Sequence, residues 1–296
     1  MMRLLRAALI LLPIGLAAFW WISRPESVSA AALAGLEGDP VRGREVFFAA
    51  GCAGCHAAPN AVGEDFLKLA GGRQFPSDFG TFVAPNISPD PEFGIGRWTD
   101  AQLVTAIMNG VSPKGEHYYP AFPYGTYAKA EPSDILSLIA FMRTLPPVAT
   151  PSQPHKVSFP FNIRRSLGIW KVLFQGNGWV INAPKTDEEF KGRYLVEALG
   201  HCAECHTPRN ALGGLEIKNW MTGAPIPGKA SGKTPGITPA QLDWSAADIA
   251  EYLKSGFTPT FDTAGGEMVT VIESTSMLTD NDRRAIALYI KGLPTP

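Results

Sequence analysis

The sequence predicts an all-α fold in which two similar helical domains follow one another, roughly at 38–148 and 185–296. We expect the segment 149–184 to join them and an N-terminal helix within 1–30 to precede them. Three observations lead to this prediction: an internal repeat, one Cys-x-x-Cys-His motif in each copy, and an uncharged apolar run near the start. A chain of 296 residues is long enough for two domains of ordinary size.

The N-terminal run extends from Ala7 to Ile22 and follows Arg3 and Arg6. It is too long for a typical signal-peptide core and slightly short for a membrane-spanning helix. Aromatic residues stand at its far end, where an aromatic belt would lie: Phe19, Trp20 and Trp21. We therefore expect a retained membrane anchor. The alternative is a signal peptide cleaved near Ser29-Ala30-Ala31.

The two cysteine motifs read Cys52-Ala53-Gly54-Cys55-His56 and Cys202-Ala203-Glu204-Cys205-His206. Thiols one helical turn apart can each form a thioether bond to a haem edge, and the histidine that follows lies under the iron as an axial ligand. The alternative is two zinc-binding or redox Cys-x-x-Cys pairs. The motifs predict two covalently bound haem c groups, attached at Cys52, Cys55, Cys202 and Cys205, with His56 and His206 as axial ligands. Because haem c is attached outside the cytoplasm, we expect the protein on the periplasmic side of a bacterial inner membrane.

The repeat extends over most of each domain. Gly43-Arg44 matches Gly192-Arg193, and Trp98-Thr99-Asp100-Ala101-Gln102 matches Trp244-Ser245-Ala246-Ala247-Asp248. Both tryptophan segments predict a helix that begins with a capping box, and Gly110 and Gly256 end these helices. A last helix closes each domain with an apolar stripe at i, i+3, i+4 and i+7: Ile135, Leu138, Ile139 and Met142 in the first copy, and Ile286, Tyr289, Ile290 and Leu293 in the second.

The segment between the domains begins with several prolines and contains two apolar runs, Phe159-Pro160-Phe161 and Ile169-Trp170-Lys171-Val172-Leu173-Phe174. These runs are too apolar for a free linker. We expect a strap packed across both domains; the alternative is a patch that faces a partner or a membrane.

A low-spin electron-transfer haem needs a sixth iron ligand, usually Met or His. In the second domain Met268 follows three residues, Gly265-Gly266-Glu267, on a loop after the Trp244 helix. Glycines there allow the backbone to approach the haem face. We expect Met268 to be this ligand. Met277 and Met221 are its rivals, and packing in the core is the alternative role for Met268.

The first domain departs from this pattern. The position 24 residues after Trp98 is Phe122, whereas the position 24 residues after Trp244 is Met268, and phenylalanine cannot bind iron. The repeat assigns Met108 to the interior of a helix and Met142 to the core, so neither is at the position of the expected ligand. We expect His117, on the same loop as Phe122, to be the sixth ligand; an ordinary loop histidine over a five-coordinate iron is the alternative. Since His/Met ligation raises the reduction potential, the second haem should have the higher potential.

Two tryptophans and two histidines have less defined roles. Trp98 and Trp244 occupy equivalent sites, where each indole N–H either contacts a haem propionate or packs in the core. His201 directly precedes Cys202 and cannot reach its own iron, so we interpret it as structural. His155 lies in the inter-domain segment without a pattern around it.

Two further runs carry a resemblance to a known family. Gly200 to Arg209 and Tyr119-Pro120-Ala121-Phe122-Pro123-Tyr124 resemble the cytochrome c subunits of membrane-bound bacterial alcohol, gluconate and aldehyde dehydrogenases. The resemblance covers nearly the whole chain after the N-terminal run. It implies two class-I-like cytochrome c domains in tandem that pass electrons from a periplasmic dehydrogenase towards the respiratory chain. Many such subunits have three haem domains and carry Met at the position of Phe122.

Composition limits the other possible functions. Charged residues make up 18% of the chain and the net charge is −1, so no basic surface indicates a nucleic-acid partner. We expect an electron carrier and no enzyme. Its donor would be a periplasmic dehydrogenase or another redox protein, and its acceptor an oxidase, a quinone-linked complex or a soluble cytochrome. The alternatives are a di-haem peroxidase that uses an open first haem with Glu116 as acid, and a gas sensor.

Overall fold

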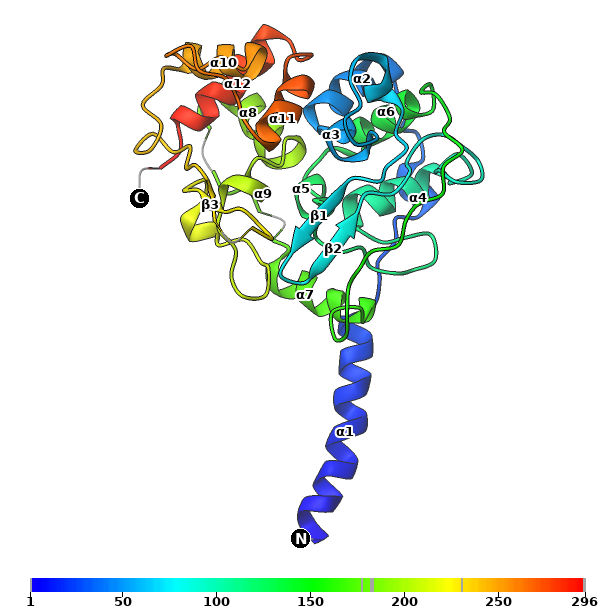
Figure 1. The fold of residues 1–296 in the computed structure, drawn as a ribbon. Coiled ribbons are helices and arrows are strands. Elements are labelled where there is room, and N and C mark those ends of the chain that lie inside the picture. Colours follow the sequence, from blue (N-terminus) through cyan, green and yellow to red (C-terminus); the bar gives the residue numbers. More distant parts are fainter. Residues whose placement is uncertain (1, 177, 182–183, 230, 295–296) are drawn as a thin grey trace.

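Each half of the chain builds its core from two helices that cross, one near its start and one at its end (Figure 1). The computed structural model describes residues 2–176, 178–181, 184–229 and 231–294. The first domain contains α2 (Pro40–Ala49), α3 (Cys52–His56), α4 (Asp100–Val104), the π-helical η3 (Thr105–Asn109), α5 (Tyr124–Tyr127) and α6 (Pro132–Met142). The second contains α8 (Asp187–Tyr194), the π-helical η5 (Leu195–Leu199), α9 (Ala203–His206), α10 (Ala246–Ser255), α11 (Glu267–Thr275) and α12 (Asp280–Lys291). The described residues also form four short 3₁₀ helices: η1 (Ala30–Leu33), η2 (Gly63–Leu67), η4 (Arg164–Ser166) and η6 (Ile217–Asn219).

The repeated Gly-Arg pair is explained by these helix crossings. In the first domain α2 packs on α6, and a Cβ added at Gly43 would lie 1.9 Å from the Ser137 carbonyl oxygen. In the second domain α8 packs on α12, and a Cβ added at Gly192 would lie 2.1 Å from the Ala285 carbonyl oxygen. Only glycine allows the two helix backbones to come this close.

The predicted helix signals are confirmed. Thr99 forms a capping box with Gln102 at the start of α4, and Ser245 forms one with Asp248 at the start of α10. Gly110 and Gly256 adopt left-handed backbone angles, with φ of 58° and 79°, at the ends of these helical segments. The two closing stripes are buried in the core, with at most 7% of any of their residues exposed.

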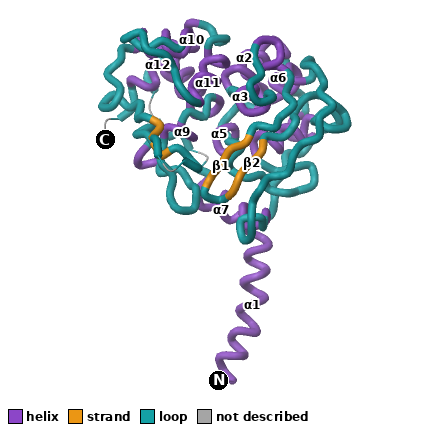
Figure 2. Tube along the Cα trace, in the orientation of Figure 1, coloured by secondary structure: helices purple, strands orange, loops and turns teal. Residues whose placement is uncertain are grey.

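The prediction of an all-α fold is wrong, because the described residues also form two small antiparallel sheets (Figure 2). β1 (Gln74–Ser77) pairs with β2 (Gly80–Val83), and β3 (Ala224–Pro225) pairs with β4 (Lys233–Thr234). In the first sheet Phe75 lies opposite Phe82, an aromatic pair of the kind that stabilises neighbouring strands. The fold is therefore mostly helical with small sheets, which are too short to give a periodic signal in the sequence.

The predicted membrane-anchor helix is also wrong. The apolar run does form a helix, α1 (Met2–Ile22), which projects from the domains (Figure 1). Within the described part of the chain, however, no helix combines the length and the apolar character needed to cross a membrane.

The segment 149–184 contacts both domains, apart from 177, 182 and 183, which lie outside the described residues. Lys156 forms a β-bridge with Thr81 of the first domain. The helix α7 (Leu167–Phe174) follows, where Lys171 Nζ donates to the Gly110 carbonyl at 2.9 Å. On the same helix the Trp170 indole donates to the Leu212 carbonyl of the second domain at 2.8 Å. These hydrogen bonds hold the segment against the two halves of the molecule.

Candidate functional site

Both Cys-x-x-Cys-His motifs are helical, which places the two thiols of each motif one turn apart. The first motif forms all of α3, and in the second Cys202 is the N-cap of α9. All four cysteines are free, so no disulfide competes with attachment of a prosthetic group. The motif helices have the geometry that two thioether bonds to one porphyrin edge require.

The histidine of each motif is oriented by a proline carbonyl in the same way. His56 Nδ1 lies 2.9 Å from the Pro85 carbonyl oxygen, and His206 Nδ1 lies 2.8 Å from that of Pro235. A carbonyl oxygen only accepts hydrogen bonds, so Nδ1 must carry the proton and Nε2 keeps its lone pair. A second partner of this kind commonly fixes the tautomer of a metal-binding histidine. The residues therefore fit a haem whose iron binds Nε2.

In both domains the segment that leads to this proline is also bound to the motif helix by an equivalent backbone hydrogen bond. The Gly71 amide donates to the His56 carbonyl and the Gly223 amide to the His206 carbonyl, both at 2.7 Å. Neither proline was predicted as a site residue. The sequence does carry a signal, because each proline lies two positions before a matching run, Ile87-Ser88-Pro89 in the first domain and Ile237-Thr238-Pro239 in the second.

The protonation of these groups suits iron and thioether chemistry. Burial lowers the pKa of His56 and of His206, which keeps the imidazoles neutral and able to bind a metal. Burial also raises the pKa of the Cys52 thiol to about 12 and that of the Cys202 thiol to about 11. Redox-active cysteines have lowered pKa values instead. Among the described residues no three His, Cys, Asp or Glu side chains gather into a metal-ion site.

Met268 lies in the first turn of α11, after Gly266, whose φ is 59°, and its side chain is half-buried. Of its rivals, Met277 is 46% exposed and Met221 is fully buried. The Met221 carbonyl accepts from the Ile237 amide at 2.9 Å, just as the Leu69 carbonyl accepts from the Ile87 amide at 3.0 Å in the first domain. Met221 is therefore the counterpart of a leucine in the core.

The start of α11 lies next to the motif helix of the other domain. Thr270 is within van der Waals distance of a Cβ added at Gly54. Arg73 joins the two elements, because it donates to the Gly54 carbonyl and also pairs with Glu267. The segment that carries Met268 is thus fixed against α3.

His117 is only 3% exposed. Its Nε2 lies 2.9 Å from the carbonyl oxygen of Ser23, the residue that follows α1. Its Nδ1 is buried and has no hydrogen-bond partner among the residues that the structure describes. Burial lowers the pKa of His117, so the ring is neutral. One nitrogen is therefore available to a metal, while the other is engaged by Ser23. Neighbouring Glu116 is exposed, and Phe122 packs on Tyr127 with ring centroids 5.7 Å apart.

The tryptophans of the repeat are half-buried against the core. The Trp98 carbonyl accepts from Arg143, and the Trp244 ring meets Tyr252 edge-on with centroids 5.1 Å apart. Two methionines of the first domain were weighed as iron ligands. Met142 is buried in the core, and Met108 is partly buried and packs against the core.

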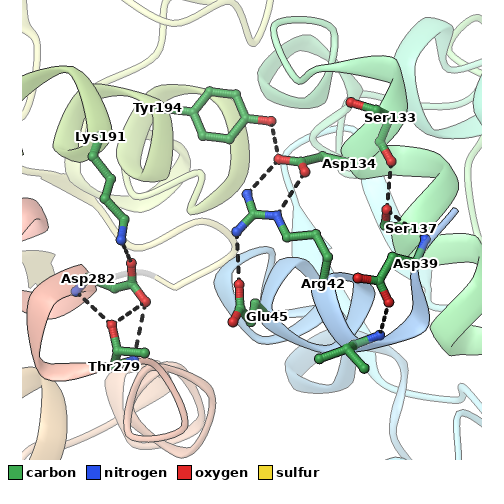
Figure 3. A network of polar contacts seen from close by, with 11 residues as sticks. Asp39, Arg42, Glu45, Ser133, Asp134, Ser137, Lys191, Tyr194, Thr279 and Asp282 are labelled. Carbon is green, nitrogen blue, oxygen red and sulfur yellow. Dashed lines mark hydrogen bonds and ion pairs between the residues drawn. The ribbon is translucent and has the colours of Figure 1, made fainter. Parts of the chain in front are cut away.

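A polar seam at the end of α8 and along η5 joins the two domains. It consists of Tyr194 at the end of α8, Glu197 in η5, and His201, which follows Gly200 just after η5. The Tyr194 hydroxyl donates to Asp134 at 2.7 Å, next to the paired Arg42 (Figure 3). Buried Glu197 lies 3.8 Å from Lys129 Nζ of the first domain, and His201 Nε2 lies 3.1 Å from the Ala50 carbonyl oxygen. No local pattern in the sequence predicts this seam.

The carboxyl group of Asp134 shows how strongly the seam is paired. Burial alone would raise the pKa of Asp134, but hydrogen bonds from Arg42 and Tyr194 outweigh burial and hold the pKa below its usual value. Asp134 is therefore ionised at neutral pH. Its two oxygens accept from Arg42 Nε at 2.9 Å and from Arg42 Nη2 at 2.8 Å.

Comparisons with known proteins agree with the two motifs. The family model for cytochrome c matches residues 40–146. A diheme c-type cytochrome from Cereibacter sphaeroides is 54% identical over 294 residues, which are 99% of this chain and 99% of that protein. The cytochrome subunit of a fructose dehydrogenase from Gluconobacter japonicus is 38% identical over 86% of this chain and 52% of that subunit. The cytochrome c subunit of a quinone alcohol dehydrogenase from Gluconacetobacter polyoxogenes is 36% identical over 82% of this chain and 53% of that subunit. The chain thus spans about half the length of these two dehydrogenase subunits.

Proposed function

Because the chain belongs to the cytochrome c family, whose members carry covalently bound haem, we propose that it holds two haem groups and passes electrons from a periplasmic dehydrogenase towards the respiratory chain. It is an electron-transfer protein and not itself an enzyme, as the names of its relatives indicate. The observation that carries the proposal is the twin geometry of the two motifs. His56 with Pro85 and His206 with Pro235 are the same device built twice.

The donor and the location follow from chemistry and from the relatives. Relatives named as cytochrome subunits of fructose and alcohol dehydrogenases support a dehydrogenase as donor. Attachment of haem c outside the cytoplasm supports a periplasmic location. The acceptor is an oxidase, a quinone-linked complex or a soluble cytochrome.

The two domains give their iron different surroundings under this proposal. When bound, haem supplies one-electron iron chemistry whose potential depends on the axial ligands. His206 and Met268 form the ligand pair in the second domain, and a methionine ligand raises the potential. His56 and His117 form the pair in the first, with His117 binding through the unpartnered Nδ1 or after release from Ser23. Electrons then flow from the first domain to the second.

Removing the proposed sixth ligands tests this assignment. Met268→Ala should lower the potential of the higher-potential haem and abolish its methionine-ligated spectrum. His117→Ala should convert the other haem to a high-spin form that binds carbon monoxide when reduced. The measurement is a spectroelectrochemical titration of each purified variant.

Two variants serve as matched controls. Met277→Ala removes an exposed methionine of the second domain, and His155→Ala removes a histidine of the inter-domain segment that accepts from the Val83 amide of the first domain. The ligand assignment fails if Met268→Ala leaves both potentials unchanged, or if His117→Ala leaves both haems low-spin. Peroxide turnover by the unmodified protein would instead favour a peroxidase.

A further inference from the structure

The two haem-attachment segments are joined by a hydrogen bond from one domain to the other. The Ala50 carbonyl, two residues before Cys52, accepts from His201 Nε2 at 3.1 Å. His201 directly precedes Cys202. A path of one hydrogen bond and the residues Ala50 and Gly51 thus connects Cys52 with His201 and the adjoining Cys202.

The same carbonyl has a second donor from its own domain. The Tyr127 hydroxyl on α5 donates to the Ala50 carbonyl at 3.0 Å. The Tyr127 ring also meets the His201 ring edge-on, at an interplanar angle of 89° and with centroids 6.1 Å apart. The Ala50 carbonyl, at the end of α2, therefore accepts from both α5 and the segment that leads into α9.

His201 holds a backbone conformation that a non-glycine residue rarely adopts, with φ of 39°. Such a conformation costs free energy and persists only where the surroundings determine it, often at functional sites. At this position it turns the imidazole towards the Ala50 carbonyl oxygen.

We propose that His201 is a positioning residue for electron exchange between the two haems, because its hydrogen bond to Ala50 fixes the two attachment segments relative to one another. The proposal rests on the proposed function, since it requires both haems. The imidazole is held at two points, by the Ala50 carbonyl and by the Tyr127 ring.

The test compares two variants that each remove one donor from the same carbonyl. His201→Phe keeps an aromatic ring against Tyr127 but loses the bond between domains. Tyr127→Phe keeps its ring and loses only the bond within the first domain. We expect electron exchange between the haems, followed after flash reduction of the complete protein, to slow severalfold in His201→Phe and to stay near the unmodified rate in Tyr127→Phe. His201→Gln, which retains an N–H donor, should restore much of the rate.

Covalent haem content, measured by mass spectrometry on the same samples, separates the possible failures. Fewer than two haems in the unmodified protein would overturn the proposed function. Two haems with unchanged exchange in His201→Phe would overturn the positioning role alone. An equal slowing in both phenylalanine variants would also overturn it, because that result reports general loosening around Ala50.

Discussion

Replacing Cys202 and Cys205 together by alanine is expected to yield a protein that carries one haem instead of two. Each motif attaches its own prosthetic group, and the two motif helices lie in separate domains. The pair Cys52→Ala and Cys55→Ala should likewise lose one haem and retain the other. Intact-mass spectrometry counts the attached groups, and a redox titration identifies which remains. The Cys202 and Cys205 variant should keep the lower-potential haem.

These two double variants serve as controls for each other. If either of them lost both haems while its remaining motif was intact, the domains would not mature independently. If either kept both haems, covalent attachment through these cysteines would be wrong.

Replacing Glu197 by alanine is expected to lower the free energy of unfolding by about 3–5 kcal/mol, because it breaks a buried ion pair and leaves several buried donors without an acceptor. The Glu197 carboxylate is buried and accepts from the Val180 amide at 2.6 Å, the Ile181 amide at 3.0 Å and the Tyr289 hydroxyl at 2.8 Å. Lys129 of the first domain would lose its partner as well. Urea unfolding measures the change.

Glu188→Ala is the matched control, on α8, which leads directly into η5. Glu188 pairs with Arg284 at 3.0 Å on the surface, where the arginine side chain is 65% exposed. Such pairs contribute about 0–1 kcal/mol. Similar losses in the two variants would contradict the central position that the structure gives to Glu197.

The helices that pack within one domain were predictable from the sequence, because their signals are local. The capping residues Thr99 and Ser245, and the terminating glycines Gly110 and Gly256, act within one turn of a helix. The repeat also indicated Gly43 and Gly192, although only the structure shows that they allow two helix backbones to touch.

The features that the sequence did not predict depend on contacts between distant residues. Pro85 is 29 residues from His56, and no local pattern indicates that its carbonyl orients the imidazole. The seam from Tyr194 to His201 requires knowledge of how the domains meet. Each strand of the β1–β2 hairpin has four residues, which is too short for an alternation of buried and exposed side chains to be recognised in the sequence. The apolar run near the start does form the helix α1, but no helix of the described residues is long and apolar enough to cross a membrane.

Low-temperature electron paramagnetic resonance of the fully oxidised protein tests most directly the claim that the chain holds two unlike haems. We expect two low-spin ferric signals of equal intensity, one with His/Met character that disappears in Met268→Ala and one with bis-histidine character that disappears in His117→Ala. Two identical signals, or a single signal from one haem per chain, would contradict the claim.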